Sequence, residues 1–135
     1  MGIKGHAGGD EVMIRNDTRG SVLATRGRVA TTMRDRTVGL LGTSELPAGH
    51  GLWIERSPSI HMFFMRYAID AVFVDRDGRV IRIVEHLRPW RIVAGVPGAR
   101  DCLELPAGSV RPTVSQVGDV LSLVPINDPE TSPVA

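Results

Sequence analysis

Two ionisable side chains, His61 and Asp70, lie in the most apolar stretch of this sequence, residues 59–75. The same stretch holds all three Phe, the only Tyr and two of the five Met. A histidine and a carboxylate that meet across a bend can act as a general base and its orienting partner. The alternative is structural: a core histidine bonded to a backbone carbonyl, and an aspartate that caps a turn or pairs with an arginine.

No nucleophile signature accompanies this pair. The pattern Gly-x-Ser-x-Gly is absent, and Cys102 is expected to be an inert, buried thiol. Neither i,i+4 nor His-x-His spacing occurs among the four histidines, which are His6, His50, His61 and His86. We therefore expect no metal and no cofactor. A metal site built from His50, His61 and a carboxylate is the arrangement left open.

Several arginines gather around Trp90 in the sequence. They are Arg82, Arg88, Arg91 and Arg100. Arginine beside an aromatic ring suits an acidic ligand or a single-stranded nucleic acid. A solvated hairpin edge explains the pattern more simply. Because the formal net charge is only +1, nothing in the composition attracts nucleic acid or anionic membranes generally, and neither is an expected partner.

Two further carboxylates, Glu104 and Asp119, form a second possible site. They would act as a catalytic pair only if the fold brought them within a few ångströms of each other. Asp119 follows Gly118 and is more simply expected to close its own turn by accepting a hydrogen bond from a backbone N–H.

The length of 135 residues indicates one ordinary domain. We expect it to span residues 12–126, between a flexible leader at 1–11 and a flexible tail at 127–135. A single cysteine allows no intrachain disulfide, and no apolar run reaches the roughly 20 residues that cross a bilayer. These features favour a cytoplasmic protein.

Short apolar segments separated by turn residues predict a β-rich α+β fold. Its sheet is expected to be mostly antiparallel, curled into a partial barrel or two layers. One main helix is predicted over residues 32–41, opened by Thr32 with capping-box spacing to Asp35 and ended by Gly42. A hairpin is predicted at about 68–84, turning at residues 75–78, and residues 85–100 are expected to be a long loop. Further strands are expected at 12–15, 22–25, 52–54, 101–105 and 120–124.

Seven short pieces of the sequence resemble a known family. They are Arg36-x-x-Gly39-Leu40-Leu41, Gly51-Leu-Trp-Ile54, Ile60-His-Met-Phe-Phe-Met-Arg66, Ile69-Asp-Ala-Val-Phe-Val-Asp75, Gly78-Arg-Val80, Leu103-Glu-Leu-Pro-Ala-Gly108 and Gly118-Asp119. Together, in this order, they resemble the prokaryotic family called domain of unknown function 192. The resemblance covers about residues 22–124 and implies a small β-rich fold. It implies no reaction and no functional residues.

Three functional hypotheses remain. The first is a non-catalytic module that binds a small ligand or peptide in a groove beside residues 61–70, covered by the loop at 85–100. The residues expected to line that groove are His61, Phe63, Met65, Arg66, Asp70 and Trp90. The second is a small enzyme with His61 as general base, oriented by Asp70. The third is an accessory protein that interacts through a sheet edge. The sequence predicts no oligomeric state.

Overall fold

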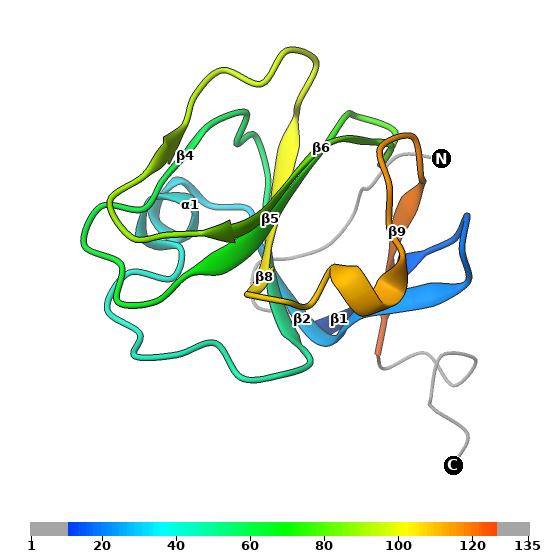
Figure 1. Cartoon of the computed structure of the whole chain (residues 1–135), viewed down its shortest axis with the longest axis horizontal. Helices are drawn as coiled ribbons and strands as arrows, with labels where there is room; N and C mark the ends of the chain where they lie inside the picture. Colours follow the sequence, from blue (N-terminus) through cyan, green and yellow to red (C-terminus); the bar gives the residue numbers. More distant parts are fainter. Residues whose placement is uncertain (1–10, 127–135) are drawn as a thin grey trace.

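A seven-stranded sheet organises residues 11–126, the part of the chain that the computed structural model describes (Figure 1). Its strand order is β6-β5-β8-β3-β2-β1-β9. The strands are β1 (Glu11–Asn16), β2 (Ser21–Ala30), β3 (His50–Ile54), β5 (Ile69–Val74), β6 (Val80–Leu87), β8 (Asp101–Pro106) and β9 (Leu121–Pro125). A separate ribbon pairs β4 (Ile60–His61) with β7 (Ile92–Val93), and the helical elements are α1 (Met33–Val38) and the 3₁₀ turn η1 (Arg111–Thr113).

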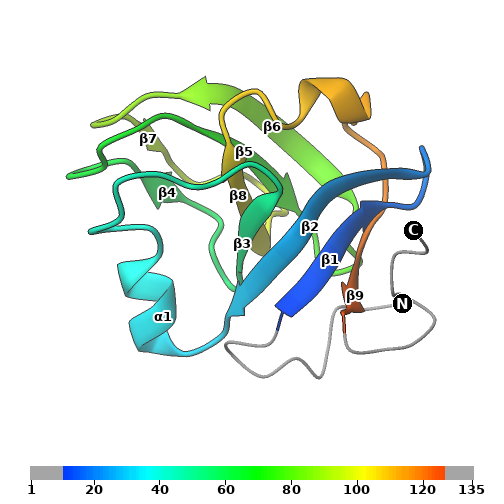
Figure 2. The same ribbon diagram turned by 90° about the horizontal axis from the view of Figure 1, so that it is seen from below.

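The sheet is mixed rather than purely antiparallel. Strands β2 and β3 run parallel, from the Arg26–His50 pair to the Ala30–Ile54 pair, because α1 and the segment after it return the chain to the same end of the sheet. The other pairs are antiparallel, as predicted. The sheet is strongly curled (Figure 2) but not closed into a barrel, because its edge strands β6 and β9 are not paired with each other. An isolated bridge between Arg79 and Val120 links the residues next to these two edges.

Helix α1 begins where the sequence predicts but is much shorter. The Thr32 hydroxyl caps it by accepting a hydrogen bond from the Asp35 backbone N–H at 3.0 Å. It ends at Gly39, whose φ of +51° a helix cannot continue, rather than at Gly42. The prediction of one main helix over 32–41 is therefore wrong, and six residues form a short cap on one end of the sheet.

The hairpin formed by β5 and β6 confirms the sequence prediction. The Asp75 carboxylate accepts hydrogen bonds from the backbone N–H groups of Asp77 and Arg79, both at 2.9 Å, and Gly78 has a φ of +82°. Every residue of β5 is buried, as expected for a strand covered on both faces. The predicted loop at 85–100 is partly wrong, because β6 continues to Leu87 and β7 pairs with β4.

Two hydrophobic clusters lie on opposite faces of the central strands, because alternate residues of a strand point to opposite sides. Val72 and Val74 join the cluster that contains Trp53, inside the curl of the sheet. Ala71 and Phe73 join the second cluster, which the segment after α1 and the β4–β7 ribbon cover with Leu40, Ile60 and Val93. The candidate site lies in this second layer.

The predicted leader and tail fall mainly on residues 1–10 and 127–135, which lie outside the described residues. Glu11 already belongs to β1.

Between residues 11 and 126, no helix has the length and apolar character needed to cross a membrane.

Candidate functional site

Asp70 is a structural anchor in this fold. Its carboxylate is fully buried and accepts three backbone hydrogen bonds, from His86 at 2.9 Å, Gly108 at 3.1 Å and Val110 at 3.0 Å. It therefore ties β5 to the end of β6 and to the turn after β8. Burial of a carboxylate is tolerated when such donors surround it.

His61 lies away from that anchor, as the exposed residue of strand β4. Its Nδ1 accepts a hydrogen bond from the Phe63 backbone N–H at 3.3 Å. The donors to Asp70 are all backbone groups of other segments, so the structure does not bring His61 and Asp70 together as a base and its orienting carboxylate. The predicted catalytic pair is not formed.

A pocket next to His61 contains a different carboxylate, Glu104. The pocket has a volume of about 90 Å³ and lies between the end of α1, the segment around β4 and the central strand β8. Its walls are formed by Arg36, Gly39, Leu40, Leu41, Ile54, Ser57, Ser59, Ile60, His61, Met65 and Glu104. Five of these eleven residues are polar or charged: Arg36, Ser57, Ser59, His61 and Glu104.

Glu104 occupies the middle of the sheet. It stands on β8 opposite Leu52 of β3 and Ala71 of β5, and only 6 % of its surface is exposed. Among residues 11–126 no donor hydrogen-bonds its carboxylate and no cation pairs with it, and its oxygens keep some contact with solvent, because no fully buried side-chain oxygen of these residues lacks a hydrogen-bond partner. Burial raises the pKa of Glu104 from 4.5 to about 7. Near neutral pH this group can therefore either donate or accept a proton.

The polar groups around Glu104 come from three segments. Arg36, at the end of α1, is half-buried, and its Nε donates weakly to the Thr32 carbonyl at 3.4 Å. The Ser59 hydroxyl accepts from the Gly95 backbone N–H at 2.6 Å and keeps its own O–H as a donor. Ser57 donates to the Ser59 carbonyl at 3.0 Å. Arg36, His61 and the Ser59 hydroxyl therefore have capacity for further polar contacts.

Aromatic side chains continue outward from the pocket. The ring of His61 lies 5.1 Å from that of Phe63, and Phe63 lies 6.0 Å from Trp90. Of the residues predicted to line one groove, His61 and Met65 line the pocket, Phe63 and Trp90 lie beside it, and Arg66 is exposed. Asp70 belongs to a different part of the fold.

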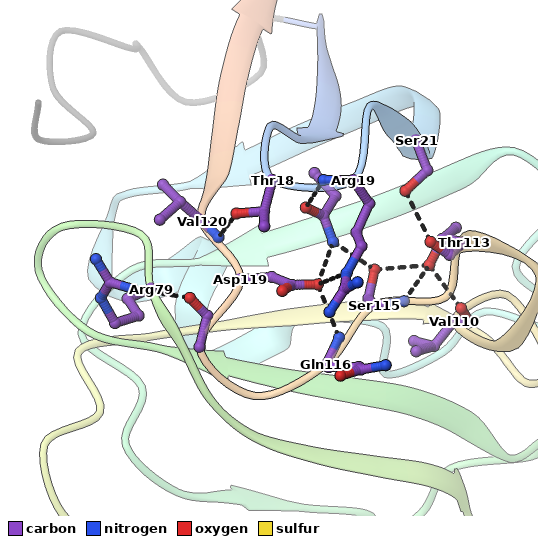
Figure 3. Close-up of polar contacts among 12 residues, drawn as sticks. Thr18, Arg19, Ser21, Arg79, Val110, Thr113, Ser115, Gln116, Asp119 and Val120 are labelled. Carbon is purple, nitrogen blue, oxygen red and sulfur yellow. Dashed lines mark hydrogen bonds and ion pairs between the residues drawn. The ribbon is translucent and has the colours of Figure 1, made fainter.

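Asp119 is the buried carboxylate of a separate polar network (Figure 3). Its Oδ2 accepts from the Asn16 amide at 2.9 Å, from Arg19 Nε at 3.0 Å and from the Gln116 backbone N–H at 2.9 Å. Burial raises its pKa, but these hydrogen bonds outweigh that effect and the pKa is lowered. The prediction that Asp119 closes its own turn is confirmed, and Glu104 is not its partner.

The remaining sequence candidates are structural or isolated. Cys102 is buried on β8, and burial above all raises the pKa of its thiol well above the ordinary value. Among the described residues, no three His, Cys, Asp or Glu side chains lie close enough together to hold a metal ion. Arg82, Arg88 and Arg91 are exposed, and Arg100 is half-buried and lies 3.7 Å from Asp101.

The sequence marks Glu104 as a charged residue between Leu103 and Leu105 in a strand, but it does not indicate the pocket. Arg36 and Ser57, which line the same pocket, carry no comparable signal, because only the fold brings α1 and the residues before β4 to the same side of β8.

Comparison with known proteins places the chain in a family. The family model DUF192, described as an uncharacterized ACR, matches residues 14–123. A UPF0127 protein of Thermococcus sibiricus is 33% identical over 115 residues, covering 79% of this chain and 71% of that protein. A UPF0127 protein of Thermococcus gammatolerans is 35% identical over 116 residues, covering 82% of this chain and 74% of that protein.

Two solved structures have the same fold. One is a candidate transcription regulator from Sinorhizobium meliloti 1021, with a TM-score of 0.74 at 22% identity, covering 89% of this chain and 98% of that chain. The other is a protein of unknown function from Novosphingobium aromaticivorans, with a TM-score of 0.67 at 23% identity, covering 82% of each chain. At this identity the likeness concerns the fold alone. With its family model spanning most of its length, the chain belongs to the DUF192 family of uncharacterised proteins.

Proposed function

We propose that this protein is a small-ligand binding module, and that its ligand presents a hydrogen-bond donor or a cationic group to Glu104. The observation that carries the proposal is a buried carboxyl group that opens into a pocket and lacks a donor from the described residues. A group left open to a cavity is a natural place for a ligand donor.

The energetic cost of Glu104 supports this proposal. A pKa raised from 4.5 to about 7 corresponds to about 3 kcal/mol of lost stability above neutral pH, since a tenfold change in proton affinity is worth about 1.4 kcal/mol. A glutamine or an apolar residue would avoid that cost. A bound donor would recover much of it, because the attraction acts in a poorly solvated site.

The size of the pocket limits the ligand. The pocket has a volume of only about 90 Å³ and is partly open to solvent. The occupant is therefore a small polar molecule, or the ammonium or amide end of a larger ligand such as a peptide. Arg36 and His61 at the wall could contact an acceptor on the same ligand.

The proposal is tested with three small probes, methylammonium, acetamide and acetate. Amide ¹H–¹⁵N spectra recorded at pH 7.5 should show shifts around Ile60, His61 and Glu104 with methylammonium and smaller ones with acetamide. Acetate should leave these signals unchanged. The E104Q variant, which keeps the shape of the side chain, should lose the response to methylammonium. Equal responses in E104Q, or no response to either donor probe, would contradict the proposal.

A second candidate function is acid–base catalysis, favoured by the presence of Glu104 and the His61 imidazole in one pocket. A carboxyl with a pKa of about 7 is well matched to proton transfer at neutral pH. In this version Glu104 replaces Asp70 as the carboxyl that acts with His61. Turnover of a ligand found in the probe screen should be abolished by both E104Q and H61N. Binding that persists without turnover supports the binding module alone.

A further inference from the structure

We propose that the loops on either side of the β4–β7 ribbon dock this protein onto an anionic phospholipid surface. The contact surface, called here the aromatic tip, consists of Phe64, Trp90 and Ile92. The exposed arginines Arg66, Arg88 and Arg91 flank it in the sequence. The two loops extend to the same end of the molecule, away from the turn that joins β1 and β2 (Figure 2).

The aromatic tip is unusually apolar for exposed surface. Phe64 is 73 %, Trp90 59 % and Ile92 55 % exposed. The rings of Phe64 and Trp90 pack against each other, with centroids 4.9 Å apart. Ile92 lies two residues after Trp90, on β7. Exposed apolar side chains grouped in this way usually mark an interaction site.

The backbone holds the tip outward. Both loops are fastened to Met62, whose carbonyl accepts from the Trp90 N–H and whose N–H donates to the Arg91 carbonyl, each at 2.7 Å. Phe64 and Trp90 have φ values of +65° and +70°, which bulky residues rarely adopt. The fold therefore fixes both aromatic side chains in exposed positions instead of letting them turn toward the core.

The charges next to the tip in the sequence are mainly positive. Residues 60–69 and 86–93 contain three arginines and no aspartate or glutamate, although the whole chain has 15 acidic residues and a net charge of only +1. The three are the exposed Arg66, Arg88 and Arg91. This part of the molecule therefore complements an anionic partner even though the protein as a whole does not.

The chemistry of the tip favours a bilayer over a nucleic acid. Bases stack on free aromatic faces, whereas Phe64 and Trp90 are tilted by 59° against each other and Ile92 has no π-face. Trp, Phe and aliphatic side chains between arginines suit the boundary of headgroups and acyl chains. Each arginine near an anionic membrane strengthens binding about fivefold.

Vesicle titration with tryptophan fluorescence tests the proposal. Trp53 is fully buried, so a change in emission on adding vesicles reports Trp90. Vesicles of phosphatidylcholine containing phosphatidylserine should shift the emission to the blue, and pure phosphatidylcholine vesicles should not. Added salt should weaken the binding, because surface charges are screened. Vesicle sedimentation then measures the affinity of the variants.

Two sets of substitutions separate the contribution of the arginines to vesicle binding from that of the aromatic side chains. R66Q/R88Q/R91Q should weaken sedimentation with anionic vesicles about a hundredfold, and F64A/W90A should weaken it at least tenfold. V117A, which alters another exposed apolar side chain, should have no effect. E104Q should also bind vesicles normally, because the tip does not depend on the pocket. Binding to oligo(dT) without binding to anionic vesicles, or equal binding by F64A/W90A, would overturn the proposal.

Discussion

Two buried carboxylates in this protein have opposite surroundings. Asp119 is 3 % exposed and accepts hydrogen bonds from Asn16, Arg19 and Gln116, and its pKa is lowered despite burial. Glu104 is 6 % exposed and has no donor in the described chain, so burial raises its pKa to about 7. Both side chains have little exposed surface, but Asp119 lies near the surface among donors, whereas Glu104 lies in the middle of the sheet without one.

The difference in hydrogen bonding distinguishes carboxylates that stabilise the fold from one that is free to bind a ligand. Asp119, like Asp70, holds loops together and is fully occupied by groups of the protein itself. Glu104 stabilises nothing that the structure shows, and it opens into a pocket. Sites that bind ligands often retain such unfavourable groups at the expense of stability.

The largest effect is expected for D70A. Removing this carboxylate leaves three backbone N–H groups without their acceptor, those of His86, Gly108 and Val110. We expect the free energy of unfolding to fall by about 4 kcal/mol, because buried donors left unsatisfied cost about 1–3 kcal/mol each and part of this is relieved by water. Urea denaturation measures this free energy. D77A, at an exposed turn position, is the control. If D70A lost no more free energy of unfolding than D77A, Asp70 would not be an anchor.

E104Q is expected to raise the free energy of unfolding rather than lower it. Below pH 4.5 the carboxyl is protonated in both folded and unfolded chains, so the substitution should be nearly neutral. As the pH rises to about 7, only the unfolded chain loses the proton readily, and the stability of the wild type falls relative to the variant. At pH 8 we expect E104Q to be more stable by about 3 kcal/mol. Urea denaturation at pH 4.5, 6 and 8 measures this trend, and a difference independent of pH would argue against it.

A smaller effect is expected for R19Q. It removes one of three donors to Asp119, and the Arg19 side chain is 37% exposed, so we expect a loss of about 1 kcal/mol at pH 7. The lowered pKa of Asp119 stabilises the fold above pH 3.8 and this contribution disappears as the pH falls through the folded-state value. The difference between R19Q and the wild type should therefore shrink in acid. Thermal unfolding at pH 7 and pH 2.5 tests whether it does.

Local signals in the sequence predicted local structure well. Asp75 and Gly78 mark the β5–β6 turn, and the alternation along β5 fits a strand buried on both faces. The Thr32 cap also lies where its spacing indicates. These features depend on a few neighbouring residues. The end of α1 depends on distant contacts as well, because both Gly39 and Gly42 can end a helix. Leu40 packs into the core, which favours an end at Gly39.

Contacts between distant segments could not be predicted in this way. The sequence spacing of His61 and Asp70 suggested a pair, yet β4 leaves the main sheet while Asp70 remains on β5. The parallel β2–β3 pair and the pocket around Glu104 both result from the crossover through α1. No local pattern encodes that crossover, so the role of Glu104 became visible only in three dimensions.

The most direct test of this account is the titration of the Glu104 carboxyl itself. Side-chain ¹³C chemical shifts of glutamate, recorded from pH 3 to pH 9 and assigned with E104Q, report its pKa in the folded protein. The account predicts a midpoint of about 7, moving toward acid when methylammonium is bound. A midpoint near 4.5 that methylammonium leaves unchanged would mean that solvent or a protein donor already satisfies Glu104, and would contradict the account.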